Sequence, residues 1–88
     1  MVGEYEWKNT MKLVFQENGT VEHYYKGKKD AEDEWTISNG EIVVKTDPRS
    51  RVFFRINTDK SITGVAMIRD GKRTDMPKES QSTYKRIK

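Results

Sequence analysis

The single histidine, His23, is the first residue whose chemistry could be functional. It stands in an alternating run between Val21 and Tyr25. A zinc site is usually built from several His or Cys side chains, and the chain has no Cys. Nucleophilic catalysis needs a nucleophile beside such a base, and no Gly-x-Ser-x-Gly motif is present. We therefore expect His23 to be either a packed, hydrogen-bonded imidazole or a residue at the mouth of the barrel, and we expect no enzymatic activity, metal or cofactor.

Arginines alternate with an aromatic residue in the middle of the chain. On an extended strand Arg51, Phe53 and Arg55 share one face, and Phe54 points to the other. Sheets that bind single-stranded nucleic acid stack bases on rings and hold phosphates with Arg. This strand face carries one ring, to which Tyr24 could add a second. Nucleic acid is therefore the alternative partner and not the favoured one.

Four acidic residues cluster in the sequence Asp30-Ala31-Glu32-Asp33-Glu34. A calcium-binding EF-hand loop needs acidic residues at alternating positions, then a Gly and a distant Glu, and that order is absent. We interpret the segment as a solvated loop that runs into a strand beginning near residue 32. Its charges would discourage pairing at a sheet edge.

Turn dipeptides between alternating runs are the strongest structural signal in the chain. Asn18-Gly19 and Asn39-Gly40 each separate two runs in which apolar and polar residues alternate. Two-residue hairpin turns need positive φ, which Asn and Gly adopt with the least strain. The pattern predicts an all-β, antiparallel, up-and-down meander of about eight short strands that closes into a small barrel or a flattened sandwich. The strands are expected near 3–8, 11–17, 20–26, 32–38, 41–46, 51–57, 61–69, 72–75 and 82–87.

Two connections are expected to differ from tight turns. Residues 27–30 read as a longer polar connection, and residues 76–81 contain a Pro that suits the first position of a single helical turn. The absence of a linker or low-complexity tract indicates one domain, residues 1–88.

The composition of the 88 residues, 33% hydrophobic and 35% charged, suits a thin layer of buried side chains. No apolar stretch approaches the roughly 20 residues of a membrane-spanning helix, and no leader pattern opens the chain. We expect a cytoplasmic protein, or an exported one if a leader has been removed.

The net charge of +3 is unevenly distributed along the chain. Residues 1–44 hold five basic against nine acidic side chains, and residues 45–88 hold twelve against five. Such asymmetry can indicate that the basic second half binds an anionic partner. It is also explained if the acidic and basic halves of the chain face each other within one sheet system.

Period-two alternation divides the strand residues into an inward and an outward set. The inward set consists of Tyr5, Trp7, Leu13, Phe15, Val21, Tyr25, Trp35, Ile37, Ile42, Val44, Val52, Phe54, Ile56, Ile62, Ala66, Ile68 and Tyr84. The outward set is mostly charged but also contains Val14, Tyr24, Val43, Phe53, Val65 and Met67. Because sequential strands usually pair, Val43, Phe53, Val65 and Met67 are expected to adjoin on one outer surface.

Three short motifs carry a resemblance to a known family. They are Phe15-x-x-Asn18-Gly19-Thr20-Val21, Trp35-x-Ile37-x-x-Gly40-x-Ile42 and the final Tyr84-Lys85-Arg86-Ile87. The pattern resembles small bacterial lipocalin-like domains of the calycin type, which implies a closed β-barrel and no particular activity. In lipocalins proper a late Arg packs across a Trp of the first strand, so the resemblance implies that Arg86 stacks on Trp7.

We expect a non-enzymatic binding or interaction domain that self-associates as a homodimer, or docks on another protein, through the outer face of strands 41–69. The alternatives are single-stranded nucleic-acid binding and a small apolar ligand inside the barrel. An eight-stranded barrel is just wide enough for side chains or one small ligand, and the inward aromatic residues favour a packed interior.

Overall fold

Turns with positive backbone φ determine where the strands begin and end. The computed structural model describes residues 2–88. Asn39 and Gly40 have φ values of 52° and 78°, as the two-residue hairpin turn requires. At the other predicted turn only Gly19 has positive φ, because a four-residue turn is closed there by the Gly19 N–H donating to the Gln16 carbonyl. The expectation of positive φ at Asn18 is therefore wrong.

Nine strands and one short 3-10 helix follow one another along the chain. They are β1 (Gly3–Trp7), β2 (Met11–Phe15), β3 (Thr20–Tyr25), β4 (Lys28–Ser38), β5 (Glu41–Asp47), β6 (Ser50–Ile56), β7 (Ile62–Arg69), β8 (Lys72–Asp75), η1 (Lys78–Ser80) and β9 (Thr83–Arg86). The helical turn predicted within 76–81 is confirmed. The longer connection predicted at 27–30 is wrong, since Lys26 and Gly27 adopt positive φ and make a tight turn from which β4 starts at once.

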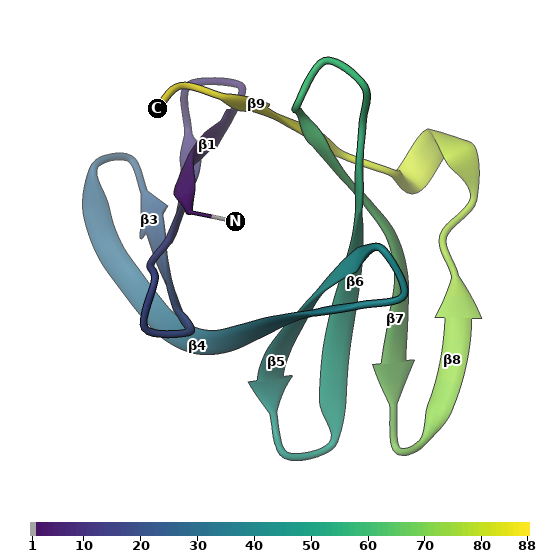
Figure 1. The fold of residues 1–88 in the computed structure, drawn as a ribbon. Coiled ribbons are helices and arrows are strands. Elements are labelled where there is room, and N and C mark those ends of the chain that lie inside the picture. The colour runs from purple at the N-terminus through teal and green to yellow at the C-terminus, as the bar shows by residue number, and fades with distance from the viewer. Residues whose placement is uncertain (1) are drawn as a thin grey trace.

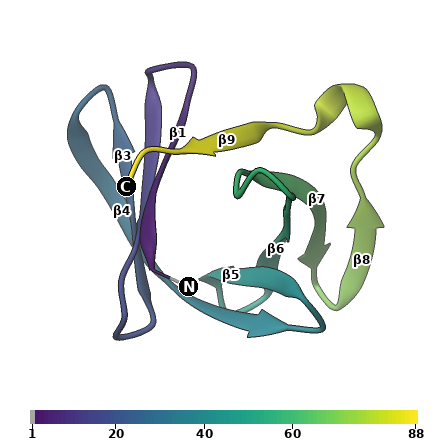
Figure 2. The ribbon, with the colours of Figure 1, turned by 45° about the horizontal axis from the view of Figure 1, so that its top comes forward.

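Eight of the strands close into an antiparallel barrel, as the sequence predicts (Figures 1 and 2). β1 to β7 pair in sequence, and β9 lies between β7 and β1 to complete the ring. β9 is reached through η1, which carries the chain from β8 back across the barrel (Figure 2).

β7 divides its second edge between two neighbours. Its first residues, Ile62 and Thr63, pair with β9, and residues 66–69 pair with β8. β8 is therefore an extra strand outside the barrel, as Figure 1 shows at the right. Val65 is an extra residue in the pairing with β6, because Phe54 lies opposite Gly64 whereas Phe53 lies opposite Ala66. A bulge of this kind exchanges the two faces of the strand beyond it.

The barrel interior is filled by side chains. Rings pack edge to face along it, with centroid distances of 5.6 Å for Tyr5–Phe15 and Phe15–Trp35 and 6.0 Å for Phe54–Tyr84. Most of the predicted inward set is confirmed as the core, namely Tyr5, Leu13, Phe15, Val21, Ile42, Val44, Phe54 and Ile62, with Trp35, Val52 and Tyr84 packed against it.

Other members of the predicted inward set are placed differently. Tyr25, Ile37 and Ile56 lie near strand ends and are 44–48% exposed. Ala66 is fully buried, as predicted, although its register partner Phe53 places it on the outer side of β7. Ile68 lies opposite Arg51 on that outer side, so the prediction that it faces the interior is wrong.

The seam between the first and last strands has the tightest packing. Arg86 lies over the ring of Tyr5, with its guanidinium carbon 5.8 Å from the centroid, and donates a hydrogen bond to the Val2 carbonyl at 3.0 Å. The expected stacking of Arg86 on Trp7 is wrong, because Arg86 is the register partner of Tyr5. A Cβ on Gly3 would meet the Lys88 carbonyl oxygen at 2.8 Å and the Arg86 guanidinium carbon at 3.1 Å. Position 3 is therefore restricted to glycine.

Replacing this glycine should open the seam. Gly3→Ala is expected to lower the free energy of unfolding by about 1–3 kcal/mol, the usual cost of overpacking. The matched control is Gly64→Ala, whose new Cβ would meet Phe54 at an ordinary 3.6 Å. Urea unfolding measures both variants, and equal losses would contradict a special requirement at position 3.

Candidate interaction surface

The outer face of β5 to β8 carries an apolar row flanked by basic side chains. Residues directly opposite each other on paired strands share a face. Val43 lies opposite Phe53, and Phe53 lies opposite Ala66. Because the neighbouring Val44 belongs to the core, this row points away from the barrel. The next row runs through Lys45, Arg51, Ile68 and Arg73. Together these two rows form what we term the outer face.

Arg73 of β8 covers part of the apolar row. Its guanidinium carbon lies 4.6 Å from the centroid of Phe53, and its nitrogens lie 3.3 Å from an Asp75 oxygen and 3.6 Å from a Glu41 oxygen. Hydrogen bonding to Asp75, and then to Glu41, raises the pKa of Arg73 above its usual value. Val43 is only 7% exposed and Ala66 is fully buried. The apolar surface left for a partner is mainly that of the half-buried Phe53 and Ile68.

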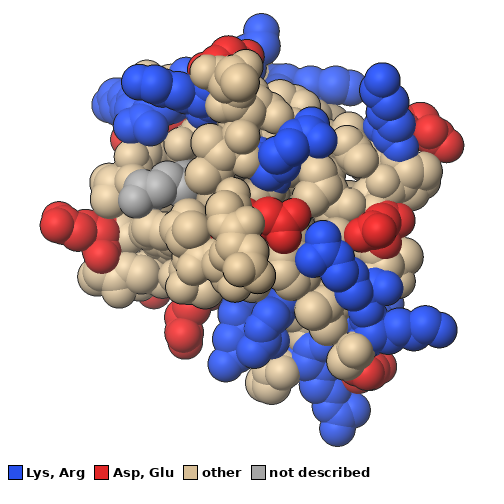
Figure 3. All heavy atoms as spheres, turned by 45° about the vertical axis from the view of Figure 1, so that its right-hand side comes forward, with Lys and Arg blue, Asp and Glu red and all other residues tan. Residues whose placement is uncertain are grey.

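Two basic side chains on this face make no ion pair within residues 2–88, although Lys45 lies opposite Glu34 of β4. Lys45 and Arg51 lie directly opposite each other, an arrangement that like charges disfavour. Within residues 2–88 no carboxylate oxygen lies within 4.0 Å of either side chain. Lys and Arg side chains gather at the lower end of the molecule in Figure 3, where Figure 1 places the β5–β6 and β7–β8 turns.

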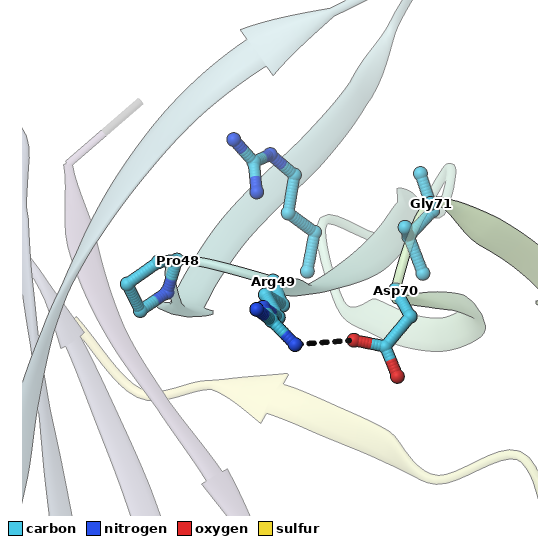
Figure 4. A pocket seen from close by; sticks show the side chains of 6 residues that line it. Pro48, Arg49, Asp70 and Gly71 are labelled. Carbon is cyan, nitrogen blue, oxygen red and sulfur yellow. Dashed lines mark ion pairs between the residues drawn. The ribbon is translucent and has the colours of Figure 1, made fainter.

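A hollow of about 560 Å³ lies between these two turns (Figure 4). Arg49 and Asp70 point toward each other across it and form a loose ion pair of 3.8 Å, with side chains 83% and 67% exposed. Since both partners are this well solvated, the pair contributes little and can exchange for an external one. The hollow is lined by Pro48, Arg49, Arg51, Ile68, Asp70 and Gly71.

The structure brings together only part of the predicted interface. Val43 and Phe53 adjoin as expected. Met67 is 37% exposed, as expected of an outward residue, but it lies opposite Val52 and does not adjoin Phe53, so only its predicted adjacency is wrong. Val65 is the extra, half-buried residue of the bulge. Strict alternation placed Met67 on the outer face and Ile68 on the inner face. The single bulge at Val65 reverses the two faces of β7 beyond it, so Ile68 lies on the outer face instead.

The other predicted outer residues lie elsewhere. Tyr24 is on β3, which β4 separates from β5. Its hydroxyl donates to a Glu22 carboxylate oxygen at 3.2 Å, and Lys12 Nζ lies 5.4 Å from its ring centroid. Val14 lines a separate hollow beside it. By contrast, Arg51, Phe53 and Arg55 share the outer face, as the nucleic-acid hypothesis expects. The Arg55 guanidinium, however, already donates a hydrogen bond to the Asn57 side-chain oxygen.

His23 is the register partner of the core residue Leu13 and is therefore on the inner face. Its Nε2 lies 2.8 Å from Asp33 Oδ2, a close contact that is not aligned as a hydrogen bond. Both side chains are largely buried, so the pair ties β3 to β4. Residues 2–88 contain no group of three or more His, Asp and Glu side chains placed to hold a metal ion.

Comparison with protein-family models, curated proteins and solved structures gives no match. Among residues 2–88 no helix has the length and apolar character needed to cross a membrane.

Removing the guanidinium that covers Phe53 should weaken the outer face. Arg73→Ala is expected to lower the urea midpoint of unfolding, because it removes the ring contact and the bridge to Glu41. Lys72→Ala removes a positive charge from the adjacent residue of the same strand and should leave the midpoint nearly unchanged. A midpoint that falls equally in both variants would show that Arg73 acts only through net charge.

Proposed function

We propose that this protein is a non-enzymatic interaction domain that self-associates through the outer face of β5 to β8. The observation that carries the proposal is the Val43–Phe53 pair on the outside of a closed barrel. Val43 is itself nearly buried, at 7% exposure, so the half-buried Phe53 is the part of this pair that a partner could cover. Contiguous apolar surface rimmed by polar residues marks binding sites.

The outer face has the composition of an interface. Aromatic residues and Arg are enriched in protein interfaces, and here Phe53 and Arg51 of β6 share one face with Arg73 of β8. An interface of standard size takes ~800 Å² from each partner, about one eighth of the 6015 Å² surface of this chain.

A charge placed in the apolar row should prevent association. Phe53→Glu is expected to convert an oligomer into a monomer in sedimentation velocity, because a desolvated carboxylate would face the partner. Ile87→Glu is the matched control, since Ile87 is 46% exposed and lies outside this face. Each variant must keep the far-ultraviolet circular dichroism of the wild type. Association that survives Phe53→Glu would contradict the proposal.

Single-stranded nucleic acid is the second candidate partner. It is favoured by Arg51 and Lys45, which make no ion pair within residues 2–88, and by the Arg73 guanidinium over the Phe53 ring, a plane on which a base could stack. Glu41 and Asp75 on the same face count against it. Binding of a labelled oligonucleotide at low salt that weakens steeply as salt rises would support this candidate, and a flat titration would remove it.

We also propose that the barrel is of the bacterial lipocalin-like type. In support, Gly3-x-Tyr5 on the first strand meets Arg86 of the last strand. Tyr5 thus occupies the position that Trp has in lipocalins proper. A small apolar ligand would have to displace packed aromatic rings, so this resemblance adds no carrier function.

A further inference from the structure

An acidic strand segment lies beside the basic outer face. β4 pairs with β3 over Lys28–Glu34 but with β5 only over Glu34–Ser38. Among residues 2–88 the second backbone edge of 28–33 therefore has no strand neighbour. Asp30 and Glu34 have no Lys or Arg nitrogen within 4.0 Å, and Glu32 pairs only with the exposed Lys29. The sequence predicts a loop at residues 30–34, because charged residues are uncommon in strands. These residues lie instead within β4.

The acidic and basic groups adjoin where β4 and β5 separate. Glu34 is the register partner of Lys45, and Lys45 is the register partner of Arg51. The hollow at this boundary is lined by Thr20, Glu32, Asp33, Glu34, Lys45, Asp47 and Pro48. Acidic side chains of β4 thus stand on one side of the boundary, and Lys45, together with Asp47, stands on the β5 side. Within residues 2–88 neither Lys45 nor Arg51 makes an ion pair within 4.0 Å.

We infer that the partner on the outer face is a second copy of this chain, whose acidic segment 30–34 lies on Lys45 and Arg51. This inference rests on the proposed self-association. A two-fold dimer uses the same patch on both copies. A two-fold axis through a boundary between acidic and basic groups places each acidic group on the basic group of the other copy. If the two-fold axis instead passed through the basic groups, Arg51 of one copy would lie against Arg51 of the other copy.

The arrangement explains one otherwise unfavourable feature. Lys45 and Arg51 are like charges directly opposite each other on β5 and β6, and a carboxylate from another chain would relieve their repulsion. This contact occurs twice in the dimer. The free edge of β4 at 28–33 is already guarded by its own charged side chains.

A charge exchange between copies tests this inference. Arg51→Glu alone and Glu34→Arg alone should each weaken the dimer at least about tenfold, since each places like charges in contact. A one-to-one mixture of the two variants should associate again, because one contact is then native and the other has both charges reversed. Sedimentation velocity at low salt gives the dissociation constants, and raising the salt should weaken the wild-type dimer.

Lys72→Glu is the control for net charge. It makes the same charge change as Arg51→Glu, and Lys72 pairs with Arg69 on the opposite face of the sheet, so the dimer should persist. If the wild type associates and Phe53→Glu disrupts it, but the mixture of charge variants stays monomeric, this inference is overturned and the proposed function stands. A wild type that is monomeric at its highest soluble concentration overturns both.

Discussion

The fold depends on closing the barrel with a very short last strand. β9 makes two register pairs with β1 and two with β7. Backbone hydrogen bonds of flanking residues extend the seam, from the Ile87 N–H to the Glu4 carbonyl and from the Gly64 N–H to the Ser82 carbonyl. Side chains add to it: Arg86 lies across Tyr5, and the hydroxyls of Thr63 and Thr83 are 2.8 Å apart. Because Arg86 approaches the backbone at Gly3, one glycine allows the two ends of the chain to meet. Every other strand pair is a local hairpin and needs no such contact.

The short seam also shapes the candidate interaction surface. β9 covers only the start of β7, and the rest of that edge is taken by β8. The bulge at Val65 accompanies this change of neighbour and turns Ala66 and Ile68 to the outer face. Arg73 on β8 can then reach Phe53 and Glu41. The surface that we propose as an interface is thus a consequence of how the barrel closes.

Much of the fold could be predicted because it rests on local signals. Turn dipeptides and period-two alternation located the strands, and they identified a core around Tyr5, Phe15 and Phe54. What could not be predicted depends on contacts between distant residues. The only local signal for the bulge at Val65 is the preceding Gly64, since an isolated glycine within a strand can mark a bulge, and period-two alternation does not use it. The placement of Arg86 on Tyr5 follows from a register between opposite ends of the chain. The first strand residues of β4 are charged and exposed, so alternation gave no signal there.

Burial of the outer face between two copies is the central claim, and isotope-filtered nuclear Overhauser spectroscopy tests it most directly. One copy carries the labels and the other none, so only contacts between copies are detected. The account predicts contacts from the Phe53 ring and the Val43 methyl groups of the labelled copy to unlabelled protein. Contacts confined to other surfaces, with none from Phe53 at concentrations where the protein associates, would contradict it.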